Sequence, residues 1–276
     1  MAKRKGRMPT IWNVDDELWR LIKPIIDADM PRKHTGRPPA DRRKALDCII
    51  HRMRSGCQWN QLPKSLGSDR TAHRYFQRWV NQRRPAENLE EDDQSVRRTR
   101  WCRLAMAIGR RRHGQGAFWG DQVGRNPTDR GKNGVKRSLL VEADGGPLSI
   151  VIAGANVHDA KLLKRTLQAI VMARPKPTSR KKQHLCLDKG YDNPTGRAAA
   201  TYRGYTPHVR RIGEEKLDER GRKRHPARRW VVERTLGWLS KCRAILVRYD
   251  KKSSNYLGLI QLACALLWYR RLNVLR

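Results

Sequence analysis

Two acidic residues stand where a chain could hold a divalent metal ion. Asp188 follows the apolar run Leu185–Leu187 and precedes a glycine turn, so we expect it at the C-terminal tip of a buried strand, the edge where sites in α/β sheets are built. Glu233 lies near the start of an expected long helix. Phosphodiester transfer uses two metal ions about 3.5–4 Å apart, and Mg²⁺ prefers carboxylate oxygens. A lone Asp at a turn is more often a capping residue, so only the joint pattern makes Asp188 and Glu233 candidate catalytic ligands of Mg²⁺ or Mn²⁺.

The composition favours double-stranded DNA as the partner of such a site. The chain has 276 residues, with 61 Lys and Arg against 26 Asp and Glu, which gives a formal net charge of +35. A charge of this size calls for a polyanion, and the phosphate backbone is the usual one. The six cysteines have no paired ligand spacing, and neither a phosphate-binding nucleotide loop nor an apolar leader is present. We therefore expect no zinc, no ATP and no membrane, and a cytoplasmic location.

Residues 1–81 read as a small all-α domain that resembles a helix-turn-helix. Asn13 can cap a first helix that begins at Val14. It is followed by a second long helix, a short helical turn at Trp59–Leu62, a break, and a last helix from Asp69 to Val80. In a helix-turn-helix the last helix enters the major groove. It would present polar side chains to DNA, namely Arg70, His73, Arg74, Gln77 and Arg78. An ordinary three-helix bundle with a solvated basic face remains the alternative.

Residues 119–276 alternate strand and helix patterns. A basic loop, expected over Gly124–Ser138, is followed by a hairpin, a helix, a strand, a helix, a strand and a helix. With one more strand in front, this is the order of a ribonuclease-H-like fold, a mixed α/β sheet flanked by helices. In that fold the first strand lies beside the fourth, and their tips converge with one helix. The basic loop adds further candidate DNA contacts at Arg130, Lys132, Lys136 and Arg137.

Several motifs together resemble bacterial insertion-sequence transposases of family five. They are Asn126–Lys132, Ala153–Asp159, Leu187–Tyr191 and Arg229–Thr235, with Gly56–Trp59 and Phe76–Val80 in the helical part. These enzymes are DDE transposases with a ribonuclease-H-like core. The resemblance implies Mg²⁺-dependent DNA cleavage and strand transfer at terminal inverted repeats, by a homodimer on DNA in the bacterial nucleoid. It also implies that Asp188 is the second acid and Glu233 the last.

The final helix departs in part from the signature of the wider group, Tyr-x2-Arg-x3-Glu-x6-Lys. Arg229 and Glu233 fit it, but Pro226 stands at the Tyr position and Ser240 at the Lys position. Lys241, one step beyond, is a substitute candidate for the DNA contact that the signature Lys makes.

The first acid of the family is missing from its expected place. The family has Ala-Asp-Gly shortly before the basic loop, where this chain has Gly109–Gln115, a segment without acidic residues. The genetic code allows codons for that segment which, read one base later, encode Ala-Asp-Gly-Ala-Met-Gly-Lys. In the same shifted frame, the codons of Met106 and Ala107 must contain a Trp codon. We hypothesise that residues 82–118, an irregular linker, are translated out of frame, so that the catalytic domain lacks a normal first strand. Asp121 is a weak substitute for the missing acid.

Two other functions fit parts of the pattern. A non-catalytic remnant would occupy transposon ends without cutting them, whereas a basic nuclease that acts on DNA junctions would not need the helix-turn-helix-like front. Three further acids have structural interpretations: Asp159 in a helix entry with His158, Asp192 as a cap, and Asp129 neutralised in its basic loop.

Overall fold

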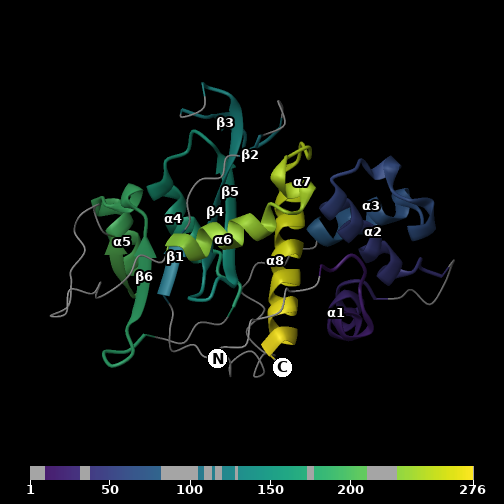
Figure 1. Ribbon diagram of the computed structural model, residues 1–276, viewed down its shortest axis with the longest axis horizontal. Coiled ribbons are helices and arrows are strands. Elements are labelled where there is room, and N and C mark those ends of the chain that lie inside the picture. Colours follow the sequence, from purple (N-terminus) through teal and green to yellow (C-terminus); the bar gives the residue numbers. More distant parts are fainter. Residues whose placement is uncertain are drawn as a thin grey trace, which may run out of the picture. The chain divides into compact units, whose positions relative to one another are not determined.

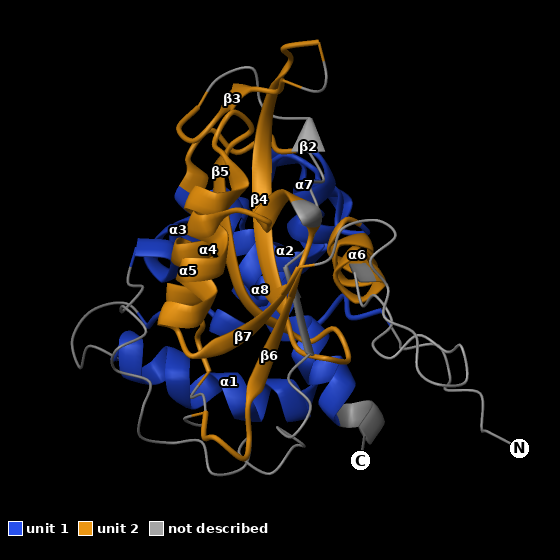
Figure 2. Cartoon of the chain, turned by 90° about the vertical axis from the view of Figure 1, so that its left-hand side faces the viewer, with its two compact units in different colours: residues 1–83, 241–247, 254–276 blue, residues 84–240, 248–253 orange. Residues whose placement is uncertain are grey.

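The computed structural model describes residues 10–31, 38–81, 105–108, 114–115, 120–127, 130–172, 177–209 and 229–275. The chain forms two compact units, coloured separately in Figure 2. Unit 1 comprises residues 1–83, 241–247 and 254–276, and unit 2 comprises residues 84–240 and 248–253. The C-terminal segments 241–247 and 254–276 thus group with the N-terminal residues, whereas the sequence pattern had placed them in the domain that begins at residue 119.

Unit 1 is helical. Its elements are α1 (Asp16–Asp29), α2 (Arg42–Ser55), the 3-10 turns η1 (Trp59–Gln61) and η2 (Lys64–Leu66), α3 (Asp69–Asn81), α7 (Arg243–Leu246) and α8 (Ser253–Leu275). Only the first residue of α8, Ser253, is assigned to unit 2. The cap of α1 is Asp15, whose side chain accepts from the backbone N–H of Leu18 at 2.7 Å, and not Asn13 as the sequence suggests. Gly56, in the left-handed conformation with φ of 72°, ends α2.

Unit 2 is built on one mixed sheet, shown in Figure 1. Its strands are β1 (Ala105–Ile108), β2 (Gly114–Gln115), β3 (Gly124–Arg125), β4 (Asn133–Val141), β5 (Pro147–Gly154), β6 (Gln183–Leu187) and β7 (Tyr205–Val209). The main order is β5-β4-β1-β6-β7, and the short β2 and β3 pair with the start of β4. β4 begins at Asn133, so the second half of the expected basic loop is strand.

The strand β1 lies within the stretch 82–118, which the sequence pattern presents as irregular. It pairs antiparallel with β4 and parallel with β6, with Ala107 opposite Cys186. Because parallel strands keep step, the last residue of β1 lies level with Leu187, the residue before Asp188. The C-terminal end of β1 therefore lies beside the strand tip that carries Asp188.

Helices cover both faces of this sheet. α4 (Asp159–Gln168) packs on β4 and β5, and α5 (Pro194–Tyr202) packs on α4 and β7, whereas α6 (Arg229–Leu239) packs on β1 and β4. Figure 2 shows α4 and α5 on one side of the sheet and α6 on the other. Accordingly, β5 is buried along its whole length and β4 everywhere except Asn133.

A glycine turn fastens α6 to the sheet. The fully buried Thr235 hydroxyl donates to the carbonyl of Gly145 at 2.7 Å, in the turn between β4 and β5. The Arg234 guanidinium donates to the carbonyl of Asp144 at 2.5 Å. Gly145 has a φ of 93°, and a Cβ there would lie 2.9 Å from the Thr235 hydroxyl oxygen. The turn therefore needs a glycine both for its backbone and for the close approach of α6.

We expect Gly145→Ala to destabilise the protein more than Gly131→Ala does. Both positions have positive φ, but nothing lies within 4 Å of a Cβ built at Gly131. The shared conformational cost is about 1–3 kcal/mol, and overpacking against Thr235 adds about 1–3 kcal/mol at Gly145 only. Thermal unfolding of both variants measures the difference, and equal melting temperatures would contradict a close contact between the turn and α6.

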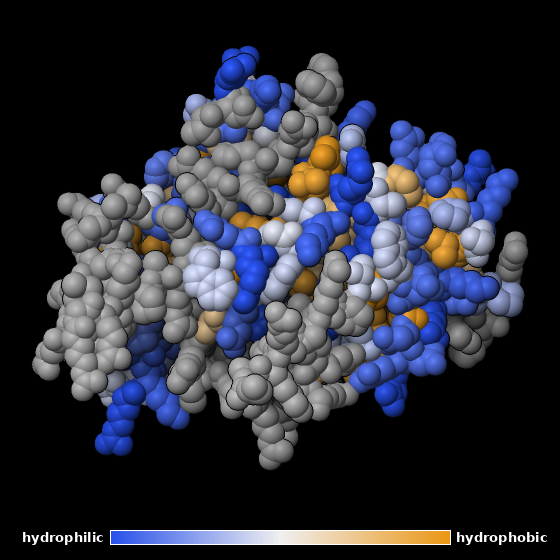
Figure 3. Space-filling view, viewed as in Figure 1, coloured by the Kyte–Doolittle hydropathy of each residue, from blue (hydrophilic) through white to orange (hydrophobic). Residues whose placement is uncertain are grey.

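On the face shown in Figure 3, the described side chains at the surface are mostly hydrophilic, with smaller hydrophobic areas between them. No helix among the residues of the described ranges is long and apolar enough to cross a membrane.

Candidate active site

Asp188 stands at the tip of β6, as the sequence predicts. It follows Leu187 directly, and its carbonyl accepts from the backbone N–H of Tyr191 at 2.9 Å, which closes the 3-10 turn η6 (Lys189–Tyr191). Its side chain is half-buried. A carboxylate held on a short turn at the end of a buried strand is well placed for chemistry, because the strand fixes its position.

Glu233 lies on α6 and is exposed. Its neighbour Arg234 anchors this part of the helix: the guanidinium carbon lies 4.7 Å from the ring centroid of Trp230 and 4.9 Å from that of Trp238. The spacing of Trp230, Arg234 and Trp238 by four residues places them on one side of the helix. Sequence reasoning had not assigned a role to this ladder, although its spacing is visible in the sequence.

Two other acids at the same edge of the sheet are engaged in ion pairs. Asp159 lies 2.9 Å from the Nζ of the buried Lys136, and Asp192 lies 2.6 Å from a guanidinium nitrogen of Arg197. The His158 ring accepts from the N–H of Ala160 at 3.3 Å and so caps α4. The contacts of Asp159 and His158 agree with a helix entry. Asp192 is not the expected cap: Asn193 caps α5 by accepting from the N–H of Gly196 at 2.8 Å.

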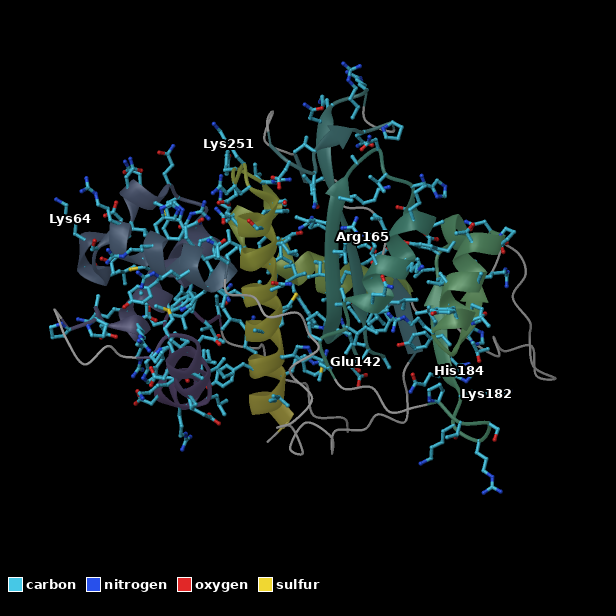
Figure 4. The ribbon with its side chains drawn as sticks, turned by 180° about the vertical axis from the view of Figure 1, so that it is seen from behind. Lys64, Glu142, Arg165, Lys182, His184 and Lys251 are labelled. Atoms are coloured by element: carbon cyan, nitrogen blue, oxygen red, sulfur yellow. The ribbon has the colours of Figure 1, made fainter. Side chains whose placement is uncertain are left out.

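Glu142 lies at the opposite edge of the sheet. Figure 4 shows it near His184, at the end where β6 begins and away from the tip that carries Asp188. Its two carboxylate oxygens accept from the backbone N–H groups of Asp144 and Gly146 at 2.9 and 2.7 Å. It braces the hairpin turn and does not replace the first acid.

Asp121 caps the start of α8. One carboxylate oxygen accepts from the backbone N–H of Ser253 at 2.6 Å and the other from the Ser253 hydroxyl. The buried Arg248 guanidinium lies 3.4 Å from the first oxygen. Partial burial raises the pKa of Asp121, but the hydrogen bonds from Ser253 and the charge of Arg248 outweigh it, so the pKa is lowered. Both oxygens are thus occupied by the helix terminus, which argues against Asp121 as a metal ligand.

We expect Asp121→Ala to lower the unfolding free energy by about 1 kcal/mol, the usual cost of losing a helix cap. The pKa of Asp121 is lowered in the folded state, so the stabilisation is present above the unfolded pKa of about 3.9 and is lost as the pH falls through the folded value. Chemical denaturation at pH 7 and near pH 3 measures this, and the gap between wild type and variant should narrow in acid. A gap that stays constant with pH would contradict the charged cap.

The acids of the described residues do not make a complete metal site. Within the described ranges, no three His, Cys, Asp or Glu side chains are close enough together to hold a metal ion. Asp188 and Glu233 come from β6 and from the helix that packs on its neighbour β1, but Asp121 does not join them. Two carboxylates do not fit the requirement of a two-metal site.

The outer side of α3 carries a row of exposed guanidinium groups. Arg70, Arg74 and Arg78 follow one another at four-residue spacing, and all three are exposed. Gln77 is half-buried because its Nε2 donates to the Oδ1 of Asn255 on α8 at 3.0 Å. Sequence reasoning missed Asn255, and no local signal could have found it at this separation.

The other expected DNA contacts divide into exposed and buried groups. Arg130, Lys132 and Lys241 are exposed, and the side chain of Arg229 lies outside the described residues. Lys136 and Arg137 are buried in β4, with exposed fractions of 6% and 1%. Cations buried in a strand cannot reach a phosphate, so these two residues serve the fold, as the pairing of Lys136 with Asp159 illustrates.

The sequence matches two family profiles. Residues 98–268 match the family described as "Transposase DDE domain", and residues 14–84 match the family described as "Putative transposase of IS4/5 family". The first match covers more than half of the chain. The chain belongs to the DDE transposases of insertion sequences. This family carries out transposition chemistry and generally uses divalent metal ions.

Two curated relatives come from Burkholderia cepacia. A protein named "Putative transposase for insertion sequence element IS402" is 32% identical over 159 residues, which is 56% of this chain and 72% of the relative. A second, "Insertion element IS402 uncharacterized 16.2 kDa protein", is 41% identical over 56 residues, which is 20% of this chain and 38% of that protein. No solved structure matches the chain.

Proposed function

We propose that this DDE transposase binds the terminal inverted repeats of its insertion sequence and that its own copy of the catalytic site is incomplete. One observation supports this most: β1 runs beside β6 toward Asp188, yet the segment that follows β1 in the sequence, Gly109–Gln115, contains no acid.

The order of the main strands supports a ribonuclease-H-like fold. The spatial order is β5-β4-β1-β6-β7. Counted along the chain, β1 is the first and β6 the fourth of these five strands; the two are parallel neighbours, and α6 packs against β1. In this arrangement Asp188 and Glu233 would be the second and third acids of the family's site. Together with a first acid they would hold Mg²⁺ or Mn²⁺, which would supply charge stabilisation for phosphodiester chemistry.

The missing acid is best explained by the shifted reading frame over residues 82–118. In that frame the chain reads Ala-Asp-Gly directly after the position of β1. Sequencing the gene tests this hypothesis: the shifted frame must contain those three codons, bounded by two compensating insertions or deletions. If other codons stand there, the frame hypothesis is excluded.

The DNA-binding part of the proposal rests on α3. Its exposed Arg70, Arg74 and Arg78 would contact phosphates in double-stranded DNA, with Arg130, Lys132, Arg229 and Lys241 as further contacts in the second unit and near the end of α6. Neutralising a phosphate releases counterions, so a row of such contacts gives strong, salt-dependent binding.

A second function follows from the same observation. A copy that binds ends but lacks the first acid would act as a non-catalytic remnant that occupies transposon ends and competes with active copies. Incubating the protein with end DNA and Mg²⁺ distinguishes such a remnant from a catalytic transposase: both give a complex, and only the catalytic enzyme gives nicked strands. A homodimer on DNA and a place in the bacterial nucleoid are part of this proposal.

A further inference from the structure

Gln77 has an unusual place on α3. At 100° per residue it falls within the exposed face that carries Arg70 and Arg74, where a side chain would ordinarily be solvated. It is half-buried instead, because Asn255 of α8 lies beside it and accepts a hydrogen bond from its Nε2 at 3.0 Å. The two residues are 178 positions apart, and both belong to unit 1.

A close approach of α8 to α3 makes this pair possible. Gly258 lies three residues after Asn255, as Val80 lies three residues after Gln77, so each pair sits on one face of its helix. A Cβ at Gly258 would lie 2.7 Å from a methyl carbon of Val80. The absence of a side chain at Gly258 thus lets the helices meet, and Asn255 is held against Gln77.

The bond to Asn255 decides which groups Gln77 can offer. A Gln amide has two N–H donors and one carbonyl acceptor. One donor is used by Asn255, which fixes the plane and the direction of the amide. When Asn255 takes the N–H that points away from the carbonyl, the remaining N–H and the carbonyl oxygen lie on the same side of the amide and can face one partner together.

That donor and acceptor match one base. In the major groove, adenine presents the N7 acceptor and the N6 donor side by side, and Gln is a usual bidentate partner of adenine. We propose that Gln77, held by Asn255, reads an adenine in the terminal DNA, whereas Arg70, Arg74 and Arg78 hold phosphates. This inference rests on the proposed binding of DNA ends by α3. The held amide has less rotamer freedom to lose on binding, which sharpens the discrimination.

The test uses the full chain and duplexes of the terminal repeat, in which each adenine in turn is replaced by 7-deazaadenine, which lacks the N7 acceptor. At one position, wild type should lose roughly tenfold in affinity, because the replacement removes one of the two hydrogen bonds and leaves the Gln77 donor unpaired. Gln77→Ala should lose about the same on unmodified DNA and no longer respond to the replacement at that position. If Gln77→Ala keeps the same response, the inference is overturned.

Three further variants separate base reading from folding. Gln77→Glu should shift the preference at that position from adenine toward cytosine, because a carboxylate accepts from the cytosine N4 amino group. Asn255→Ala and Gly258→Ala should weaken the discrimination while leaving Gln77 in place. Because discrimination is a ratio between two DNAs, it does not depend on the fraction of folded protein.

Arg74→Ala is the matched control on the same helix face. It should weaken binding to every duplex by a similar factor and leave the base preference unchanged. If wild type does not prefer terminal DNA over random duplex, the proposed end binding itself fails and the adenine contact with it. If wild type prefers the ends but no single adenine depends on Gln77, only the adenine contact fails.

Discussion

Restoring the reading frame of residues 82–118 should turn this chain into an active transposase. The frame-restored protein carries Ala-Asp-Gly directly after the position of β1, whose C-terminal end lies beside the tip of β6 that carries Asp188. A third carboxylate completes the ligand set for two metal ions, which are worth several kcal/mol of transition-state stabilisation. We expect cleavage of end DNA to rise by roughly 10³-fold or more over the present chain. A gel-based assay on labelled ends with Mg²⁺ measures the increase.

Two substitutions in the frame-restored protein identify the acids that act. Asp188→Asn and Glu233→Gln should each return cleavage to the level of the present chain while end binding persists. Asp121→Asn is the matched control, because Asp121 holds Ser253 and Arg248, and it should leave cleavage largely intact. Loss of cleavage in Asp121→Asn without loss of folding would instead make Asp121 part of the site.

Removing the row of guanidinium groups from α3 should nearly abolish end binding. Arg70, Arg74 and Arg78 are exposed on one side of the helix, and a hydrogen bond to a charged group is worth about 1.5–3 kcal/mol. Each Ala substitution should therefore weaken binding by about tenfold, and the triple variant by about 10³-fold. The slope of log affinity against log salt concentration should fall by roughly 2.7 for the triple variant, or about 0.9 for each phosphate contact. Fluorescence anisotropy at several salt concentrations gives both quantities.

A triple variant of α4 provides the control for net charge. Lys161, Lys164 and Arg165 are exposed on α4, and Figure 4 shows Arg165. Replacing them with Ala removes the same charge from the other unit. A comparable loss of affinity in both triple variants would mean that overall charge, and not the α3 surface, holds the DNA.

Local patterns predicted the parts of the fold that depend on neighbouring residues. The tip position of Asp188 follows from an apolar run that ends in a turn, and the helix predicted from Asp69 to Val80 is α3, Asp69–Asn81. The choice of Asp15 over Asn13 as the cap of α1 was not predictable, since both are good capping residues. The position of Asp15 also depends on Tyr269, near the other end of the sequence, whose hydroxyl donates to the Asp15 Oδ1 at a distance of 2.7 Å.

Distant pairings explain what the sequence pattern missed. Lys136 and Arg137 lie in a segment rich in Gly, Lys and Arg, which reads as an exposed loop, but β4 extends through them and buries both. The partner of Lys136 is Asp159, the first residue of α4, which follows the β4–β5 hairpin in the sequence. Likewise, α8 groups with the N-terminal helices through contacts such as Gln77 with Asn255, which no periodicity reveals.

The most direct test of the central claim is a single assay of the chain as it stands. The ends of its insertion sequence, recovered from the DNA that flanks the gene, are labelled and incubated with the protein and either Mg²⁺ or Mn²⁺. We predict a specific, salt-sensitive complex in which both strands stay intact. Nicks at the element ends that require the metal and disappear in Asp188→Asn would show that the site is complete and would contradict the claim.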